Sequence, residues 1–477
     1  TGRVARQQNC GSLHLPLSNV GVMAMDYRGR NGLATSIGHS PVSALIDPVA
    51  GSRNSIAEAL TNIVWAPLEN KLESVSLSAN WMWPAKNEGE DARLYNAVEA
   101  VSDFAIQLGI NIPTGKDSLS MTQKYKDGTK VYAPGTVIIS GAGNCNDINK
   151  IVTPVLKNNS DYSILYVNLS KDDFKLGGSS FAQVNNKLGN DTPTVKDAAY
   201  FAKGFDAIQD LIKADLIAAG HDISSGGLIT ALLEMCFAEQ NLAAEIDLSD
   251  LKETDLVKLL FAENSGVLIQ VKNTEAATAL LDEAGIAYSN IGYAKESKEI
   301  SIRNMDSYFH MGVAELRDIW YKTSYLLDKK QSGVNKAKER FDSYKNSPLE
   351  FTFPESFKGK LADMGLNPNR KDASGLKAAI IRDKGSNSER EMAYAMHLAG
   401  FDVKDIHMTD LMSGREDLTD VNFIAAVGGF SNSDVLGSAK GWAGAFKYND
   451  KARTSLENFM KREDTLSLGI CTGCQLL

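Results

Sequence analysis

The stretch Leu468-Gly469-Ile470-Cys471-Thr472-Gly473-Cys474-Gln475 runs from an apolar strand through a glycine-flanked turn into the start of a helix. Glycines on both sides of Cys471 relieve crowding in a tight turn, so a nucleophile can project from the top of a sheet. The helix that follows directs its positive end at the sulfur, which favours the thiolate. The stretch therefore predicts a strand–turn–helix unit that presents a reactive cysteine.

The spacing of Cys471 and Cys474 is also that of a redox pair or of half a zinc site. A zinc site needs a second pair of ligands, and Cys10, Cys145 and Cys236 lie far away in the sequence. A redox pair usually belongs to a thioredoxin-like domain, near its amino-terminal strand. Two buried core cysteines are a further interpretation. The residues of this stretch alone leave these alternatives open.

Short apolar strands at 378–381 and 423–427 precede the strand at 466–470, and helical segments separate them. Alternation of strands and helices predicts a parallel sheet covered by helices. Ligands of such sheets bind beyond the carboxyl ends of the strands, and Cys471 lies at one of these ends.

The chain upstream divides by pattern into three further segments. Residues 1–155 mix strands with two amphipathic helices, the second of which should stop at Gly109. Residues 156–305 contain apolar strands at 164–167 and 266–271. Residues 306–375 are polar and contain several prolines, which predicts a helix followed by an extended connector. We expect an α/β and α+β multidomain protein, with residues 376–477 as its parallel-sheet domain.

Composition limits the classes of partner. A length of 477 residues suggests about three domains. The formal charge of −9 argues against nucleic acid and favours small-molecule chemistry. The sequence contains no apolar run of membrane-spanning length and no signal-peptide pattern, so we expect no membrane association. Five cysteines in a chain of this length indicate a reduced, cytoplasmic protein.

A second group of polar residues suits a metal ion and a phosphate. Glu58 and Asn62 are one helical turn apart, opposite an apolar stripe, and Mg²⁺ prefers such oxygen ligands. Asp222 and Ser224 precede Gly226 and a helix start, where phosphates bind readily. A solvated helix face and a helix cap are the alternative interpretations of these two patterns.

The turn around Cys471, at Gly469–Gln475, has the form of a nucleophile elbow. This elbow and the loop at Val427–Gly437 resemble the glutaminase domain of the formylglycinamidine synthase family, a branch of the class I glutamine amidotransferases. The segment Gly385–Glu391 is similar to the first loop of that domain. The resemblance implies that Cys471 attacks the side-chain carbonyl of glutamine and that Gly428, Gly429 and Phe430 belong to the oxyanion loop. Asn432-Ser433 stands where the family usually carries an aromatic residue and a glycine.

The upstream segments resemble the paired domains of the aminoimidazole ribonucleotide synthetase superfamily, as repeated in formylglycinamidine synthases. The resemblance implies that the metal ligands are Glu58, Asn62, Asp222 and Asn19. It implies that Ser18 and Ser224 bind the nucleotide, and that Lys116, Asp117 and Ser118 are candidates for the lining of the cleft. Asn19 replaces the usual aspartate, which implies weaker Mg²⁺ binding. Ser225 replaces another common aspartate. Trp81 and Trp83 belong either to the cleft or to the core.

The resemblance covers nearly the whole chain and implies the carboxy-terminal part of a large, single-chain enzyme. Its substrates would be ATP, glutamine and formylglycinamide ribonucleotide, and its cofactors Mg²⁺ with ATP or ADP. The missing amino-terminal half would be a partner. The nucleotide site of the present chain, with Glu58, Asn62 and Asp222, resembles an auxiliary ADP site. The partner His and Glu of the glutaminase would lie beyond Leu477, so we expect this chain to be inactive alone. A catalytically silent nucleotide-binding or scaffolding module is the rival hypothesis.

Overall fold

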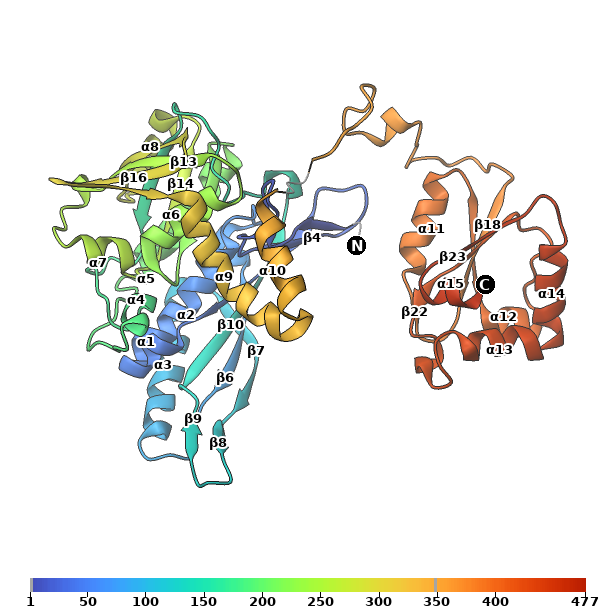
Figure 1. Ribbon diagram of the computed structural model, residues 1–477, viewed down its shortest axis with the longest axis horizontal. Helices are drawn as coiled ribbons and strands as arrows, with labels where there is room; N and C mark the ends of the chain where they lie inside the picture. Colours follow the sequence, from blue (N-terminus) through green and yellow to red (C-terminus); the bar gives the residue numbers. More distant parts are fainter. Residues whose placement is uncertain (1–2, 347–349) are drawn as a thin grey trace. The chain divides into compact units, whose positions relative to one another are not determined.

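Three sheets of four or more strands carry the fold of this chain (Figure 1). The computed structural model describes residues 3–346 and 350–477, which divide into two units, Arg3–Glu350 and Phe351–Leu477. Two mixed sheets lie in the first unit, and a parallel sheet lies in the second. The predicted α/β and α+β multidomain architecture is confirmed.

The first sheet has six strands, which in spatial order are β1 (Val4–Arg6), β4 (Gly21–Ala24), β5 (Gly32–His39), β10 (Thr136–Cys145), β6 (Ser76–Met82) and β7 (Asn111–Ser118). Every pair is antiparallel except β6–β7. Helices α1 (Pro41–Ile46), α2 (Pro48–Ile63) and α3 (Glu90–Leu108) accompany it, and α2 packs on β5 and β10. Helix α3 ends as predicted at Gly109, which adopts a φ of 71°.

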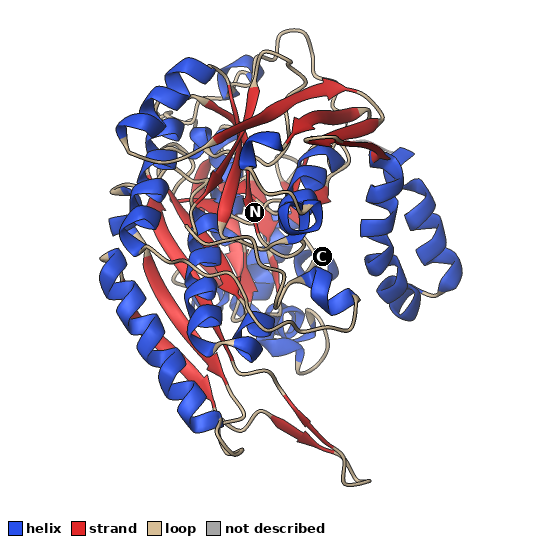
Figure 2. Ribbon diagram, turned by 90° about the vertical axis from the view of Figure 1, so that its left-hand side faces the viewer, coloured by secondary structure: helices blue, strands red, loops and turns tan. Residues whose placement is uncertain are grey.

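Two short strand pairs complete this region: β2 (Asn9–Cys10) with β3 (Leu15–Pro16), and β8 (Thr122–Lys124) with β9 (Lys130–Tyr132). The β8–β9 hairpin projects from the body of the unit (Figures 1 and 2). On β10, Val137 and Ile139 are buried toward α2, whereas Ser140 is exposed on the other face. This alternation leaves one face of the first sheet without a helix layer from α2 and α3.

The second sheet has seven strands, which in spatial order are β12 (Ile217–Ile223), β14 (Gly266–Val271), β11 (Ser163–Asn168), β15 (Ser289–Glu296), β13 (Leu242–Asp247), β16 (Glu299–Asn304) and β17 (Ser307–Gly312). Its helices are α4 (Ser180–Val184), α5 (Ala198–Lys213), α6 (Gly227–Phe237), α7 (Leu256–Phe261) and α8 (Thr274–Glu283). Alternate residues of β11 enter different cores, Leu165 with α5 and Ile164 with α6. Burial on both faces explains the unbroken apolar run of this strand.

The two mixed sheets share one core, so they form a single unit. The ring of Phe104 on α3 lies 6.2 Å from that of Phe201 on α5. Gln209 on α5 is buried and donates to the carbonyl oxygens of Val64 and Ala66 at 2.6 and 3.0 Å. Its amide oxygen accepts from the N–H of Leu68 at 2.8 Å. The buried glutamine therefore ties the end of α2 to the second sheet.

Residues 307–312, expected in the connector, instead form β17, which pairs with β16 at the edge of the second sheet. Two helices follow, α9 (Val313–Ser332) and α10 (Val334–Ser343). Trp320 and Tyr321 of α9 pack on the core that contains α6. The first part of the predicted connector is thus built onto the second sheet.

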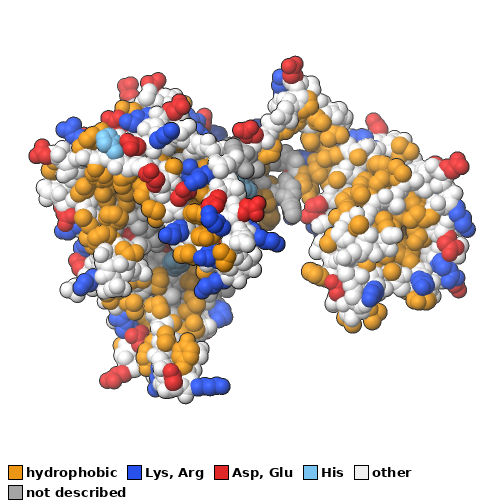
Figure 3. All heavy atoms as spheres, in the orientation of Figure 1, with side chains coloured by type: hydrophobic (Ala, Val, Ile, Leu, Met, Phe, Trp, Pro, Cys, Tyr) orange, Lys and Arg blue, Asp and Glu red, His pale blue; other side chains and the backbone are white. Residues whose placement is uncertain are grey.

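The parallel sheet has four strands in the order β20 (Asp402–His407), β18 (Lys377–Arg382), β21 (Phe423–Ala426) and β23 (Leu466–Gly469). Its helices are α11 (Glu389–Leu398), α12 (Met408–Ser413), α13 (Lys440–Tyr448), α14 (Asp450–Met460) and α15 (Thr472–Leu476), and β19 (Ser386–Asn387) pairs with β22 (Gly428–Gly429). The predicted strands and their parallel arrangement are confirmed. Among the described strands β23 lies at the sheet edge, where Leu466 and Leu468 are exposed; Figure 3 shows apolar side chains gathered over this unit.

Within the described ranges, no helix combines the length and the hydropathy needed to cross a bilayer.

Candidate functional site

Cys471 occupies a strained turn between β23 and α15. Its φ of 54° and ψ of −115° fall outside the regions that residues with a side chain normally adopt. Such strain persists only where the surrounding structure imposes it, and it is found at active sites. The Cys471 residue is exposed, so its position at the carboxyl end of a parallel strand makes it accessible to a ligand.

The two glycines that flank the cysteine are required by close backbone approaches. A Cβ on Gly473 would lie 2.0 Å from the carbonyl oxygen of Ala426 on the neighbouring strand. A Cβ on Gly469 would lie 2.4 Å from the carbonyl oxygen of Gly473. Both distances are far below van der Waals contact, so the turn closes only with glycine at these positions. The spacing that the sequence analysis identified therefore has a steric cause.

The predicted oxyanion loop lies directly beside the cysteine. A Cβ on Gly428 would lie 3.8 Å from Cys471 Sγ, so little more than the space of a methyl group separates this backbone from the sulfur. Gly429, with a φ of 108°, pairs in β22 with Ser386 of β19. The hydroxyl of Thr472 donates to the Gly429 carbonyl oxygen at 2.5 Å. The structure thus brings Gly428 and Gly429 to the nucleophile, whereas the side chain of Phe430 is 70% exposed.

The unusual pair Asn432-Ser433 adopts left-handed backbone at both residues, with φ of 52° and 54°. Asparagine tolerates this region because of its short polar side chain, and serine is less suited to it. The side chain of Asn432 donates to Oδ2 of Asp383 at 2.8 Å, and its N–H donates to the Lys384 carbonyl oxygen at 2.8 Å. These bonds hold the turn against the first loop of the domain.

The exposure of Cys471 and Cys474 reduces the number of roles that remain open for this pair. Cys471 and Cys474 are both exposed and free, so they are not core residues. Within residues 3–346 and 350–477, no three or more His, Cys, Asp or Glu side chains gather as the ligands of a zinc site would. A zinc site is therefore disfavoured, and a nucleophile or a redox cysteine remains.

A second site lies on the open face of the first sheet. A cavity of about 1080 Å³ is lined by several of the predicted residues, which are Ser18, Asn19, Glu58, Asn62 and Ser224, and by Ser225. Strands β5, β6 and β10 supply much of the remaining wall. The cavity therefore joins residues of the first sheet to the loop that follows β12 in the second sheet.

Most of the predicted metal ligands are already held by protein groups. Asn19 Nδ2 donates to Oδ1 of Asp222 at 2.9 Å, and Asn62 Nδ2 donates to the Ile37 carbonyl oxygen at 2.8 Å. Oε2 of Glu58 accepts from the N–H of His39 at 2.9 Å. Within the described residues, Asp222 Oδ2 and Asn62 Oδ1 are buried without a hydrogen-bond partner. Two buried oxygens with no donor suit a bound cation, so the residues present fit Mg²⁺.

Burial and neighbouring charges control the protonation of this site. The pKa of Glu58 is raised to about 8, first because burial disfavours the carboxylate, and also because the charges of Asp222 and Glu263 lie nearby. Burial also acts to raise the pKa of Asp222, but the charge of His221 and the hydrogen bonds from His221 and Asn19 lower it below its ordinary value. The two carboxyl groups are thus affected in opposite directions, since the pKa of Glu58 is raised and that of Asp222 is lowered.

Glu263 is a site residue that the sequence analysis missed. Its Oε1 accepts from the backbone N–H groups of Ser180 and Gly226, both at 2.7 Å. It lines a smaller hollow of about 300 Å³ whose wall shares Glu58, Ser224 and Ser225 with the large cavity. No local motif marks Glu263, because its partners come from two distant loops.

The predicted cleft segments are only partly at the cavity. Ser78 of β6 and Thr114 of β7 line it, but Lys116 and Asp117 lie further along β7, exposed and outside its wall. The Lys116 ammonium instead donates to Oγ of Ser118 at 2.8 Å. Trp83 is fully buried and belongs to the core, whereas Trp81 is partly buried.

Family models match three parts of the chain. A model described as an FGAR-AT PurM_N-like domain matches residues 1–144. A model of the carboxy-terminal domain of AIR synthase related proteins matches residues 165–303. A model of a CobB/CobQ-like glutamine amidotransferase domain matches residues 375–477. The solved structure of T. maritima PurL complexed with FGAR has a TM-score of 0.50 over 65% of this chain and 51% of that chain, at 16% identity, which indicates a shared fold.

Curated relatives match over the full length of the chain. A probable phosphoribosylformylglycinamidine synthase, chloroplastic/mitochondrial, of Arabidopsis thaliana is 41% identical over 487 residues, which cover 100% of this chain and 34% of the relative. The phosphoribosylformylglycinamidine synthase of Homo sapiens is 40% identical over 485 residues, 100% of this chain and 36% of the relative. The chain spans about a third of the length of these relatives. With three domain models in the order of the observed sheets and full-length identity of this size, the chain belongs to the phosphoribosylformylglycinamidine synthase family.

Proposed function

We propose that this chain contributes a glutaminase nucleophile and a nucleotide-binding domain pair to an ATP- and glutamine-dependent carbon–nitrogen ligase. The ligase converts formylglycinamide ribonucleotide to formylglycinamidine ribonucleotide in de novo purine biosynthesis. The observation that carries the proposal is the strained, exposed Cys471, whose sulfur lies beside the backbone of Gly428. The T. maritima PurL structure of similar fold is a complex with FGAR, which supports this substrate.

In the glutaminase step, the Cys471 thiolate attacks the side-chain carbonyl carbon of glutamine, and the carbonyl oxygen becomes an oxyanion. Backbone N–H groups of the Gly428–Phe430 loop are the candidate donors to that oxyanion, since the Gly428 backbone lies beside the sulfur. Collapse of the intermediate releases ammonia and leaves a glutamyl thioester, which water then hydrolyses. The ammonia serves as the nitrogen donor of the ligase.

Glu58 and Asn62 in the wall of the cavity, together with Asp222, which is buried behind the wall and bonded to Asn19, would hold Mg²⁺. Ser18 and Ser224 would contact the phosphates of ATP or ADP. Mg²⁺ supplies charge neutralisation to a bound polyphosphate. Asp222 Oδ2 and Asn62 Oδ1 are the oxygens that remain available for the cation. Whether the nucleotide there is turned over or serves an auxiliary role depends on the amino-terminal half, which we propose as a partner. A cytoplasmic location remains a prediction.

A catalytically silent nucleotide-binding or scaffolding module is the second candidate. The observation in its favour is the Asn19–Asp222 hydrogen bond, because it places an amide N–H group on an oxygen that a metal ion would otherwise use. Such a module would bind a nucleotide but would show no selective reactivity at Cys471.

Labelling with an electrophilic glutamine analogue tests the proposal. The parent, Cys471→Ser and Cys474→Ser are incubated with the analogue, and the modified peptides are identified by mass spectrometry. We expect selective modification of Cys471, its loss in Cys471→Ser and its retention in Cys474→Ser. Equal modification of the two cysteines, or a readily formed disulfide between them, would favour the redox interpretation. Calorimetric binding of ADP with Mg²⁺, lost in Asp222→Ala, together with absent labelling would favour the silent module.

A further inference from the structure

We infer that His221, Glu234 and Trp320 form a path of buried and half-buried contacts that positions Asp222 and couples the nucleotide site to helix α9. The inference rests on the proposed role of Asp222 at that site. Two consecutive elements and one distant helix contribute to the path, since His221 lies on β12, Glu234 on α6 and Trp320 on α9. His221 and Glu234 are accordingly positioning residues, because they act through Asp222.

The path begins beside Asp222. The His221 side chain is 3% exposed, and its Nδ1 lies 2.8 Å from the carbonyl oxygen of Asp222 and 3.3 Å from Oδ1 of the same residue. Asn19 donates to that Oδ1 as well. Oδ1 is thus fixed from two sides, and Oδ2 is the oxygen left free for a ligand. A displacement of His221 would therefore move the carboxylate that we expect to contact the cation.

The path continues through one carboxylate that contacts both neighbours. Oε2 of Glu234 lies 3.1 Å from Nε2 of His221, and Oε1 of Glu234 accepts from Nε1 of Trp320 at 2.9 Å. The Trp320 ring lies 5.7 Å from that of Phe237 at the end of α6. The charged groups that face His221 are Asp222 from its own strand and Glu234 from α6. Each oxygen of Glu234 thus contacts a different element, by a hydrogen bond to Trp320 and at ion-pair distance to His221, so a movement of Glu234 would alter both contacts.

Helix α9 is also anchored to α6 by a second buried group. Nη1 of Arg317 donates to the carbonyl oxygens of Phe237 and Glu239, both at 3.0 Å, and Arg317 is 4% exposed. These bonds satisfy the carboxyl end of α6, whose last carbonyl groups have no partner within the helix. A shift of α6 at His221 is therefore passed to α9 at two points, Trp320 and Arg317.

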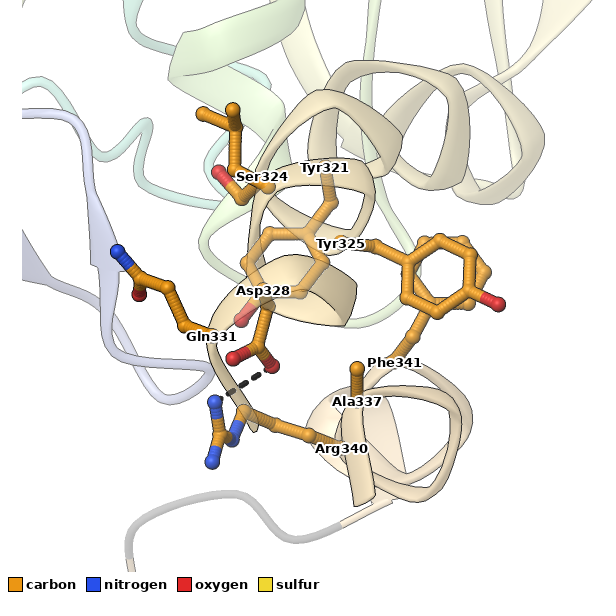
Figure 4. A pocket seen from close by; sticks show the side chains of 9 residues that line it. Tyr321, Ser324, Tyr325, Asp328, Gln331, Ala337, Arg340 and Phe341 are labelled. Atoms are coloured by element: carbon orange, nitrogen blue, oxygen red, sulfur yellow. Dashed lines mark hydrogen bonds and ion pairs between the residues drawn. The ribbon is translucent and has the colours of Figure 1, made fainter. Parts of the chain in front are cut away.

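The far part of α9 is fixed to α10, so the two helices form one hairpin. Figure 4 shows Tyr321, Tyr325 and Phe341 around a hollow between them, with the ion pair of Asp328 and Arg340 at its side. The rings of Tyr325 and Phe341 are 4.8 Å apart, and the ion pair measures 2.6 Å. This hollow of about 310 Å³ contains none of the predicted site residues. A shift of α6 would therefore displace the whole α9–α10 hairpin, which precedes residue 351 in the sequence.

The alternative explanation is that His221 is only a hydrogen-bonded core residue and that its contacts have no effect on Asp222. The two explanations differ in what happens to ligand affinity when the far end of the path is cut. Trp320→Phe removes the N–H group together with part of the indole but keeps an aromatic ring to pack near Phe237, so it breaks the path with a smaller loss of packing than alanine would cause. Glu234→Ala removes both contacts of the carboxylate. Glu245→Ala is the matched control, because Glu245 contacts Lys295 on the same sheet outside the path.

The test is calorimetric titration of the full chain with ADP in saturating Mg²⁺. Residues that orient metal ligands typically change affinity 10- to 100-fold, so we expect the Kd to rise about tenfold in Glu234→Ala. We expect a rise of about threefold in Trp320→Phe, and a double variant no weaker than Glu234→Ala, since both cut one path. The Kd of Glu245→Ala should match the parent. A parent-like Kd in Trp320→Phe and Glu234→Ala, alongside lost binding in Asp222→Ala, would overturn the inference and leave the proposed function standing.

Hydrogen exchange in the absence of nucleotide is an independent test of the coupling between Asp222 and α9. In Asp222→Ala and Glu234→Ala we expect faster amide exchange across residues 313–325 of α9, whereas Glu245→Ala should leave it unchanged. Unchanged exchange in both variants would contradict the coupling even if ADP binding behaves as proposed. Failure of the parent to bind ADP would count against the proposed function, and the exchange result would then decide the inference alone.

Discussion

Asn19 Nδ2 donates a 2.9 Å hydrogen bond to Oδ1 of Asp222, a residue 203 positions away in the sequence. The bond joins the loop before β4 to the end of β12, so it fixes the first sheet against the second at the rim of the cavity. An aspartate at position 19 would place two carboxylates face to face here, and a cation between them would offset their repulsion. The amide instead stabilises Asp222 without a metal ion.

Asn19→Asp should therefore strengthen Mg²⁺ binding and destabilise the metal-free chain. The new carboxylate replaces a hydrogen bond with charge repulsion at a buried residue, so we expect a loss of about 1–3 kcal/mol in unfolding free energy without Mg²⁺. Added Mg²⁺ should restore stability, and ADP affinity in Mg²⁺ should rise about tenfold. Thermal unfolding with and without Mg²⁺ and calorimetry provide the measurements.

Asn335→Asp, at an exposed position of α10, is the control for this variant and should change neither property. If Asn19→Asp binds Mg²⁺ and ADP no better than the parent, Asn19 is not at a metal site.

Glu58 should make stability decrease with rising pH. Its pKa of about 8 in the folded chain exceeds the ordinary value of 4.5, so the folded state binds more protons than the unfolded state between these values. Each unit between the two pKa values corresponds to about 1.4 kcal/mol, so the unfolding free energy must fall as pH rises through this window by on the order of 5 kcal/mol. Glu58→Gln should flatten the profile between pH 5 and 8, as measured by urea unfolding at several pH values.

Mg²⁺ and ADP should displace the Glu58 proton, because a cation favours the carboxylate. Calorimetry at pH 7 in buffers of different ionisation enthalpy should show proton release in the parent and none in Glu58→Gln. Equal proton release in both chains would place the titrating group elsewhere.

Gly473→Ala should destabilise the second unit. The added methyl carbon would lie 2.0 Å from the carbonyl oxygen of Ala426, so the backbone of the turn or of β21 must shift. Overpacking of this kind costs about 1–3 kcal/mol, which urea unfolding of the chain should detect. Cys471 should also lose its selective labelling, because the turn that presents it is displaced.

Gly444→Ala is the matched control, since the nearest atom to a Cβ there is 3.9 Å away and the residue lies within α13. Alanine favours a helix over glycine, so this variant should be neutral or stabilised by up to about 1 kcal/mol. A Gly473→Ala chain as stable as Gly444→Ala would contradict the observed packing of the elbow.

Ser433→Gly should stabilise the loop beside the nucleophile. Ser433 adopts a φ of 54°, where a side chain costs about 1 kcal/mol and glycine costs nothing. We expect a gain of about that size in the unfolding free energy of the second unit. Ser467→Gly, in the extended backbone of β23, should instead lose stability, because glycine gains no relief there. A loss in both variants would mean that the Ser433 side chain is needed.

Features that depend on short stretches of chain could be predicted from the sequence alone. Glycines at 469 and 473 around Cys471 set the elbow, Gly109 ended α3, and apolar runs marked the strands that form the parallel sheet. Each of these features follows from the local geometry of the backbone, which neighbouring residues control. The family likeness of the three segments was accessible for the same reason, because it is carried by contiguous motifs.

The three-dimensional packing was needed to identify which distant side chains share a site. It placed Asn19 on Asp222, added Glu263 and the His221–Glu234–Trp320 path, and left Lys116 and Asp117 outside the cavity wall. It also extended the second sheet through β17, where the sequence predicted a connector. These contacts depend on how whole sheets and helices pack, and packing sums many weak interactions between residues that no local pattern connects.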